Sequence, residues 1–313
     1  MRCLLTRCGL TALLAFWSLV LTEASSWAIA PLSVQQVAPG IYVHHGVHEE
    51  ATPENMGAIA NIGFIVGSTA VAVVDTGGSF REGEALIAAI HQVTRLPIRY
   101  VINTHFHPDH VLGNAAFSDL KPIFVAHANL PRGLSARSAD YLAMEKANLG
   151  SAFDGTQIVL PQHLVATTER LDLGGRTLLL QAYPPAHTDA DLTVLDEKTA
   201  TLFAGDLLFL ERVPSVDGSI LGWLKAIDQL AAVKAVRAIP GHGPVSAPWP
   251  QALADEKRYL SLLVKETREQ LEAGHSLQDA VKSVGLSERS KWQLFDGYNQ
   301  RNVTTAYTEL EWE

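Results

Sequence analysis

The residues of this chain that are best suited to chemistry lie in one heptapeptide, Thr-His-Phe-His-Pro-Asp-His, at residues 104–110. It follows an apolar run, residues 98–103, that has the composition of a buried strand. Because side chains two residues apart on an extended backbone share a face, His105 and His107 can reach one metal ion. Pro108 interrupts regular strand pairing, so Asp109 and His110 can turn toward a second ion. Imidazole and carboxylate groups without sulfur favour zinc or another borderline divalent metal, whereas the simplest alternative is a polar surface loop.

Three more potential ligands lie downstream, each where a strand-like run ends. His187 follows residues 177–183, Asp206 follows residues 200–204, and His242 follows residues 236–239. Each one alone is a weak signal, because a histidine after two prolines is usually a loop residue and a Gly-Asp pair after a strand is usually a turn.

The order and spacing of these four segments resemble the metallo-β-lactamase superfamily, in which His-x-His-x-Asp-His precedes a histidine, a bridging aspartate and a final histidine. The resemblance runs from about Val37 to Pro248. It implies two Zn²⁺ ions per chain, with one site at His105, His107 and His187, a second at Asp109, His110 and His242, and Asp206 as the bridge. Asp75, in Val-Val-Asp-Thr-Gly, matches the family's early acidic motif. We expect Asp75 to hydrogen-bond and orient a ligand histidine, the alternative being an ordinary turn residue.

The resemblance implies a zinc-dependent metallo-hydrolase acting on a small-molecule substrate. A hydroxide bridging the two metals would attack an ester, thioester, lactone or amide-type bond, and Asp109 would hold this nucleophile and manage its proton. Three alternatives stay open: a mononuclear iron persulfide dioxygenase, β-lactamase activity, and a non-catalytic metal-binding relay partner. Asp217 and Asp228 lie outside the motif, so we expect Asp→Asn substitutions there to be neutral.

Within the superfamily, the chain resembles the exported zinc metallohydrolases of quinoprotein relay systems. The resemblance rests on residues 46–55, 205–214 and 302–313. It implies a periplasmic context and a link to a PQQ-dependent dehydrogenase system, without naming a substrate.

The surrounding pattern predicts an α/β fold, the αββα four-layer sandwich, over residues 34–250. Helices are expected near residues 81–94, 136–148 and 221–233, and a second group of strands across residues 163–205. Residues 251–313 are expected to form a helical C-terminal extension packed on the sandwich, either as a docked appendage or as a wall of the substrate pocket. Residues 44–60 are expected to be a solvated loop, the alternative being a loop that overhangs the metals.

Composition and the N-terminal segment bear on location and partners. Residues 1–28 have the charge and apolar pattern of a signal peptide, which predicts a periplasmic protein, with a retained membrane anchor as the alternative. Both cysteines, Cys3 and Cys8, fall in this segment, so no cysteine ligand is expected in the mature protein. A net charge of −9 without a basic cluster argues against nucleic-acid binding. The sequence leaves the oligomeric state open.

Overall fold

The structure is a computed structural model that describes residues 29–313, so the expected signal peptide lies outside the described residues. The strands are β1 (Gln35–Ala38), β2 (Ile41–His44), β3 (Ile62–Val66), β4 (Val71–Val74), β5 (Ile98–Asn103), β6 (Ile123–His127), β7 (His163–Val165), β8 (Thr168–Asp172), β9 (Thr177–Ala182), β10 (Leu192–Asp196), β11 (Thr201–Phe209), β12 (Arg237–His242) and β13 (Ala247–Pro248). The α-helices are α1 (Phe80–Val93), α2 (Pro108–Val111), α3 (Asn114–Phe117), α4 (Leu130–Leu149), α5 (Ile220–Ala231), α6 (Leu253–Glu272), α7 (Leu277–Ser283) and α8 (Phe295–Leu310). Short 3₁₀ helices span Ser118–Leu120, Gly150–Phe153 and Leu286–Lys291.

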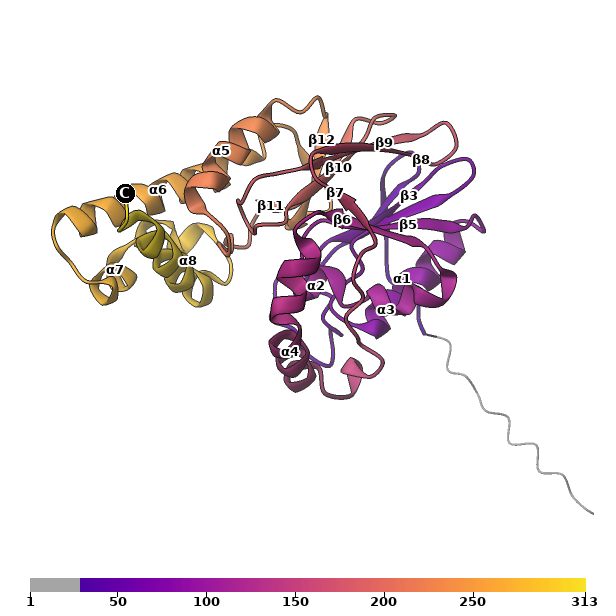
Figure 1. Cartoon of the computed structure of the whole chain (residues 1–313), viewed down its shortest axis with the longest axis horizontal. Helices are drawn as coiled ribbons and strands as arrows, with labels where there is room; N and C mark the ends of the chain where they lie inside the picture. The colour runs from indigo at the N-terminus through magenta and orange to yellow at the C-terminus, as the bar shows by residue number, and fades with distance from the viewer. Residues whose placement is uncertain (1–28) are drawn as a thin grey trace, which may run out of the picture.

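The strands form two sheets (Figure 1). One has seven strands in chain order, β1 to β7, and the other has six in the order β13-β12-β11-β10-β9-β8. Strands β4 to β7 run parallel to one another, and β11 runs parallel to β12. Parallel strands end at the same edge of their sheet, so the loops that follow β4, β5, β11 and β12 are brought together.

Clusters of buried apolar side chains pack the four layers of the molecule together. One cluster lies between the two sheets and includes Ile65, Ile102 and Val194. A second cluster joins the outer face of the seven-stranded sheet to α1, and a third joins β11 to α5 and α6. The expected αββα sandwich is therefore confirmed.

Helices α1 and α5 of the sandwich begin close to where the sequence predicts them. Ser79 caps α1 by accepting a hydrogen bond from the Glu82 N–H, so this helix spans Phe80–Val93. Helix α5 begins in the same way after Ser219. Helix α4 is longer than the predicted residues 136–148, because it already starts at Leu130, with a proline in its first turn.

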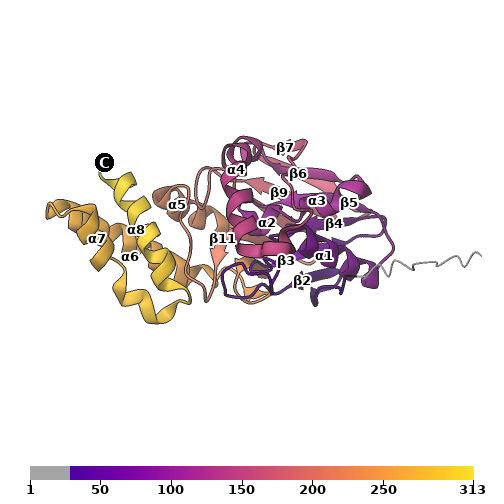
Figure 2. The same ribbon diagram turned by 90° about the horizontal axis from the view of Figure 1, so that it is seen from below.

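The last three helices lie at one end of the molecule, beyond α5 (Figures 1 and 2). Helix α6 packs on α5 and β11, and α8 packs on α6. The buried carboxylate of Glu256, on α6, accepts a hydrogen bond from the Phe209 N–H at 2.8 Å, which ties α6 to the end of β11. None of the helices within residues 29–313 has the length and apolar character needed to cross a membrane.

Candidate metal centre

All seven predicted ligands come together where the two sheets end. His105 and His107 follow β5, and Asp109 and His110 lie on the short helix α2. His187 lies between β9 and β10, Asp206 lies within β11, and His242 is the last residue of β12.

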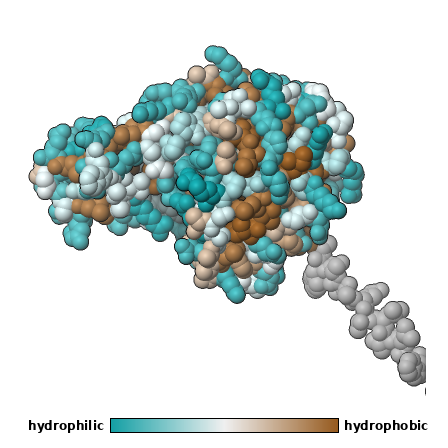
Figure 3. Space-filling view, viewed as in Figure 1, coloured by the Kyte–Doolittle hydropathy of each residue, from teal (hydrophilic) through white to brown (hydrophobic). Residues whose placement is uncertain are grey.

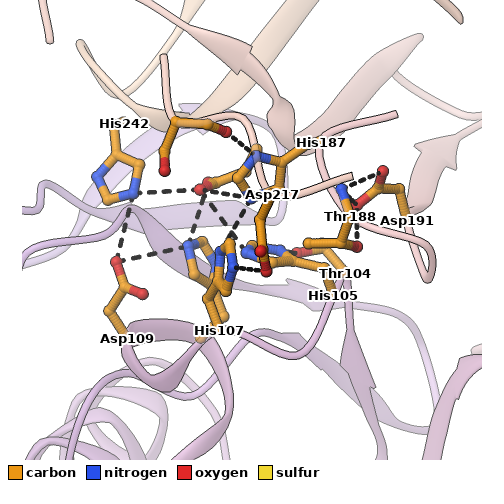
Figure 4. A network of polar contacts seen from close by, with 12 residues as sticks. Thr104, His105, His107, Asp109, His187, Thr188, Asp191, Asp217 and His242 are labelled. Carbon is orange, nitrogen blue, oxygen red and sulfur yellow. Dashed lines mark hydrogen bonds and ion pairs between the residues drawn. The ribbon is translucent and has the colours of Figure 1, made fainter. Parts of the chain in front are cut away.

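Their ligand atoms form two adjacent groups. His105, His107, His187 and Asp206 make up the first, and Asp109, His110 and His242 make up the second. Within each group, the nitrogen and oxygen atoms that could bind a metal lie within 4.8 Å of one another. Figure 4 shows His242 facing Asp109 on one side of the centre, with His107 and His187 on the other.

Asp206 lies between the two groups. Its Oδ1 is 3.1 Å from the Nε2 of His110, and its Oδ2 is 3.4 Å from the Nε2 atoms of both His187 and His242. A side chain on Gly241 would meet Asp206, since a Cβ there would lie 1.8 Å from Oδ1. A glycine is therefore required beside this carboxylate.

Asp75 fixes the position of the second group. Its Oδ2 lies 2.9 Å from the Nδ1 of His110, so the expected hydrogen bond to a site histidine is present. The same carboxylate accepts hydrogen bonds from the N–H and hydroxyl of Thr104. Because the Thr104 hydroxyl donates to Asp75, it can accept from the Nδ1–H of His105, 3.0 Å away. Both histidines thus direct Nε2 toward the centre.

Backbone carbonyls do the same for two other histidines. His187 Nδ1 lies 2.6 Å from the carbonyl oxygen of Ser215, and His242 Nδ1 lies 2.8 Å from that of Ile59. Each Nδ1–H donates outward, so each Nε2 presents a lone pair to the centre.

Asp217 is a correction to the sequence analysis, which placed it away from the site. It lies in the loop before α5, and its Oδ2 is 3.2 Å from the Nε2 of His107 (Figure 4). This contact leaves His107 Nδ1 facing the Nε2 of His187 at 3.0 Å. Asp217 is therefore an outer partner of a predicted ligand, and Asp217→Asn is not a neutral control.

The donor set fits divalent cations. Lone pairs of His107 and His187 face each other, and His242 Nε2 faces carboxylate oxygens of Asp109 and Asp206, arrangements that are repulsive without a cation between them. Among the residues that the structure describes, the buried atoms His105 Nε2, His110 Nε2 and Asp206 Oδ1 have no hydrogen-bond partner.

Protonation also suits metal binding. Burial lowers the pKa of His187 to about 3 and that of His105 well below its usual range, so both are neutral at physiological pH, as metal binding requires. Burial alone would raise the pKa of Asp206, but the imidazoles of His242 and His110 outweigh it and hold this pKa well below its ordinary value. Asp206 is therefore a carboxylate.

A cavity of about 590 Å³ opens over the centre. The ligands His107, Asp109, Asp206 and His242 form its floor. Its walls come mainly from four segments: Glu50, Ala51, Gly57 and Ile59 from the early loop; Tyr141, Met144, Glu145 and Asn148 from α4; Arg212, Ser215, Val216 and Asp217 from the loop after β11; and Tyr298, Arg301 and Thr305 from α8. The early loop thus overhangs the centre, and α8 forms part of the pocket wall.

Four neighbours of the site were missed by the sequence analysis: Asp217, Arg212, Glu145 and Asp191. Asp191 accepts from the Thr188 N–H at 2.9 Å and from its hydroxyl at 2.6 Å, which shapes the loop after His187. The Thr-x-x-Asp spacing is a recognisable turn signal for Asp191. The other three carry no local motif.

The sequence model described as "Metallo-beta-lactamase superfamily" matches residues 56–242, more than half of the chain. The chain belongs to this superfamily. The match contains all seven clustered residues and Asp75.

Among similar proteins, the uncharacterized protein YobT of Bacillus subtilis is 29% identical over 147 residues, covering 46% of this chain and 58% of that protein. A linear primary-alkylsulfatase of Pseudomonas is 40% identical over 45 residues, covering 14% of this chain and 8% of the enzyme. A solved structure of the sec-alkylsulfatase Pisa1 from Pseudomonas superposes with a TM-score of 0.68 at 18% identity, covering 89% of this chain and 50% of that one. The chain thus spans less than two thirds of these relatives, and the Pisa1 likeness shows the fold alone.

Proposed function

We propose that this metallo-hydrolase holds two Zn²⁺ ions and cleaves an ester, thioester, lactone or amide-type bond. The observation that supports this most is Asp206, whose two oxygens face histidines of both groups. His105, His107 and His187 would hold one ion, Asp109, His110 and His242 the other, and Asp206 both. Two such ions polarise a substrate oxygen and lower the pKa of a bound water toward neutrality.

Asp109 is the residue best placed to handle the proton of the attacking water. It lines the cavity, and its Oδ2 lies 3.3 Å from His242 and 3.8 Å from His110. Burial would raise its pKa, but the neighbouring His110 and the contact with His242 outweigh this and hold the pKa below its usual range. Asp109 is therefore ionised, and it can orient water by accepting its proton in a hydrogen bond.

A sulfate ester is the second candidate substrate, because the short match to a linear primary-alkylsulfatase is 40% identical. Hydrolysis of a sulfate ester would make the same use of two Lewis-acidic ions and an activated water.

We also propose export to the periplasm and a role beside a PQQ-dependent dehydrogenase system. The pattern of residues 1–28 and the resemblance to quinoprotein relay hydrolases support this context. The mature protein recovered from cells should begin at Ile29 or Pro31, whereas an intact Met1 in the membrane fraction would contradict export.

The function is tested on purified mature protein with a panel of thioester, lactone, ester, β-lactam and sulfate-ester substrates, with and without chelator. Turnover of at least one substrate that chelation abolishes and zinc restores is expected. One iron per chain together with oxygen consumption would instead favour the persulfide dioxygenase.

A further inference from the structure

The cavity wall over the metal centre contains two arginines from different parts of the chain. Arg212 lies in the loop after β11, and Arg301 lies on α8, in the helical extension. The surface where this extension meets the sandwich is strongly hydrophilic (Figure 3). The metal-binding motif uses neither arginine.

Arg212 is a buried cation whose hydrogen-bonding capacity is only partly used. Its side chain donates from Nη2 to the Tyr298 hydroxyl at 2.8 Å, and its Nε has no hydrogen-bond partner within residues 29–313. Its Nη1 lies 3.1 Å from His242 Nδ1. Because that nitrogen carries the proton donated to the carbonyl of Ile59, it cannot accept a hydrogen bond from Arg212. The residue is only 4% exposed, and it reaches the surface at the wall of the cavity over the centre.

Tyr298 lies beside the guanidinium groups of both Arg212 and Arg301. Its ring centroid lies 5.0 Å from the guanidinium carbon of Arg212 and 5.4 Å from that of Arg301. Within residues 29–313, the ion pairs of the arginines involve other positions, such as Arg137, Arg258 and Arg289, and include neither Arg212 nor Arg301. Two cations beside one ring repel each other, and an anion bound near both would reduce that repulsion.

Within residues 29–313, the carboxylates of the cavity do not form ion pairs with Arg212 or Arg301. Asp206 and Asp109 are directed at the histidines, and Asp217 pairs with His107 and Arg137. Burial and the nearby charge of Asp109 raise the pKa of Glu145 to about 7, which reduces its charge at neutral pH. Glu50 contacts the Tyr298 hydroxyl, 3.3 Å away.

We propose that Arg212 and Arg301 bind an anionic group of the substrate, so that the enzyme selects esters carrying a carboxylate or a sulfate close to the bond that is cleaved. Tyr298 holds both guanidinium groups in place. The helical extension thereby contributes to substrate specificity through α8. This inference rests on the proposed hydrolase function.

The test measures both binding and turnover with the zinc-loaded full-length mature protein. Calorimetry compares benzenesulfonate and benzoate with neutral benzamide, and kinetics compare a neutral aryl ester with its carboxylate-bearing counterpart and with an aryl sulfate. Arg301→Gln should weaken binding of the anionic probes about three- to tenfold, and Arg212→Gln should weaken it roughly tenfold or more. Both changes should raise KM for the anionic substrates by more than they raise KM for the neutral ester.

Two further variants control for structural effects. Arg212→Lys keeps the charge without the planar fork, so it should restore part of the anion affinity lost in Arg212→Gln. Arg268→Gln, which removes an exposed arginine paired with Glu313 on the far part of the extension, should change nothing.

The results separate this inference from the proposed function. Arginine-dependent binding of benzenesulfonate or benzoate without turnover of any substrate would support the anion site and count against the hydrolase. Turnover with equal losses for neutral and anionic substrates, or no binding of either anionic probe to the unmodified protein, would overturn the anion site. Tighter arginine-dependent binding of benzenesulfonate than of benzoate identifies a sulfate-type anion, and the reverse identifies a carboxylate.

Discussion

Replacing Asp206 with asparagine removes the charge that lies between both groups of histidines. The side chain keeps nearly the same volume, so the close approach to Gly241 is preserved and the fold should survive. An amide, however, is a poor bridge between two cations, and its NH₂ group would face imidazole nitrogens 3.1–3.7 Å away. Changes to residues that only support a metal ligand cost about 10- to 100-fold in affinity or activity, so loss of this ligand should cost more than about 100-fold.

The assay is metal content after dialysis, together with the rate of hydrolysis and the thermal unfolding curve. Asp206→Asn should retain about one zinc per chain or less, lose nearly all activity, and unfold cooperatively. Asp228→Asn is the matched control, because Asp228 is exposed and pairs with Lys257 on the surface. If Asp206→Asn still bound two metals and turned over normally, Asp206 would not be the bridge.

Two further predictions concern Asp217, which contacts a predicted metal ligand, and Glu288, which contacts cations of the helical extension. Asp217→Asn should weaken zinc binding about tenfold, because the amide can donate to His107 Nε2 and so move the imidazole proton to Nδ1. Zinc titrations of Asp217→Asn and Asp228→Asn measure this, and equal affinities would contradict it. Burial alone would raise the pKa of Glu288. Hydrogen bonds from Arg258 and Lys291 outweigh burial and lower this pKa to about 2. Its folded-state pKa lies below the unfolded value of about 4.3, so its stabilisation is complete above that pH and is lost as pH falls toward 2. Glu288→Gln should therefore cost about 1–2 kcal/mol of unfolding free energy at pH 7, a value that already allows for the solvent exposure of its partners. The loss should be much smaller at pH 2.5. Denaturant titrations measure it, and a loss that does not change with pH would refute the prediction.

The part of the site that could be predicted from the sequence is the part that follows strand ends. His105, His107 and His242 lie where an apolar run meets a loop, and parallel strands bring such positions to one edge. Asp75 was recognisable for the same reason, since it follows β4.

The outer parts of the site depend on tertiary packing, which no local pattern shows. Asp217 reaches His107 only because the loop before α5 folds over the centre. Tyr298 and Arg301 enter the cavity because α6 docks on β11 and carries α8 with it. Asp217 was misjudged because its separation from the motif in the sequence was taken as separation in space.

The measurement that tests the central claim most directly is the metal content of the mature protein, purified without added chelator and analysed by mass spectrometry for zinc, iron and manganese. The two groups of ligands sharing Asp206 predict about two zinc ions per chain when zinc is available, with hydrolysis lost on chelation and regained as the second ion is restored. A single ion that saturates activity, or activity that persists when both groups are empty, would contradict a two-metal hydrolase.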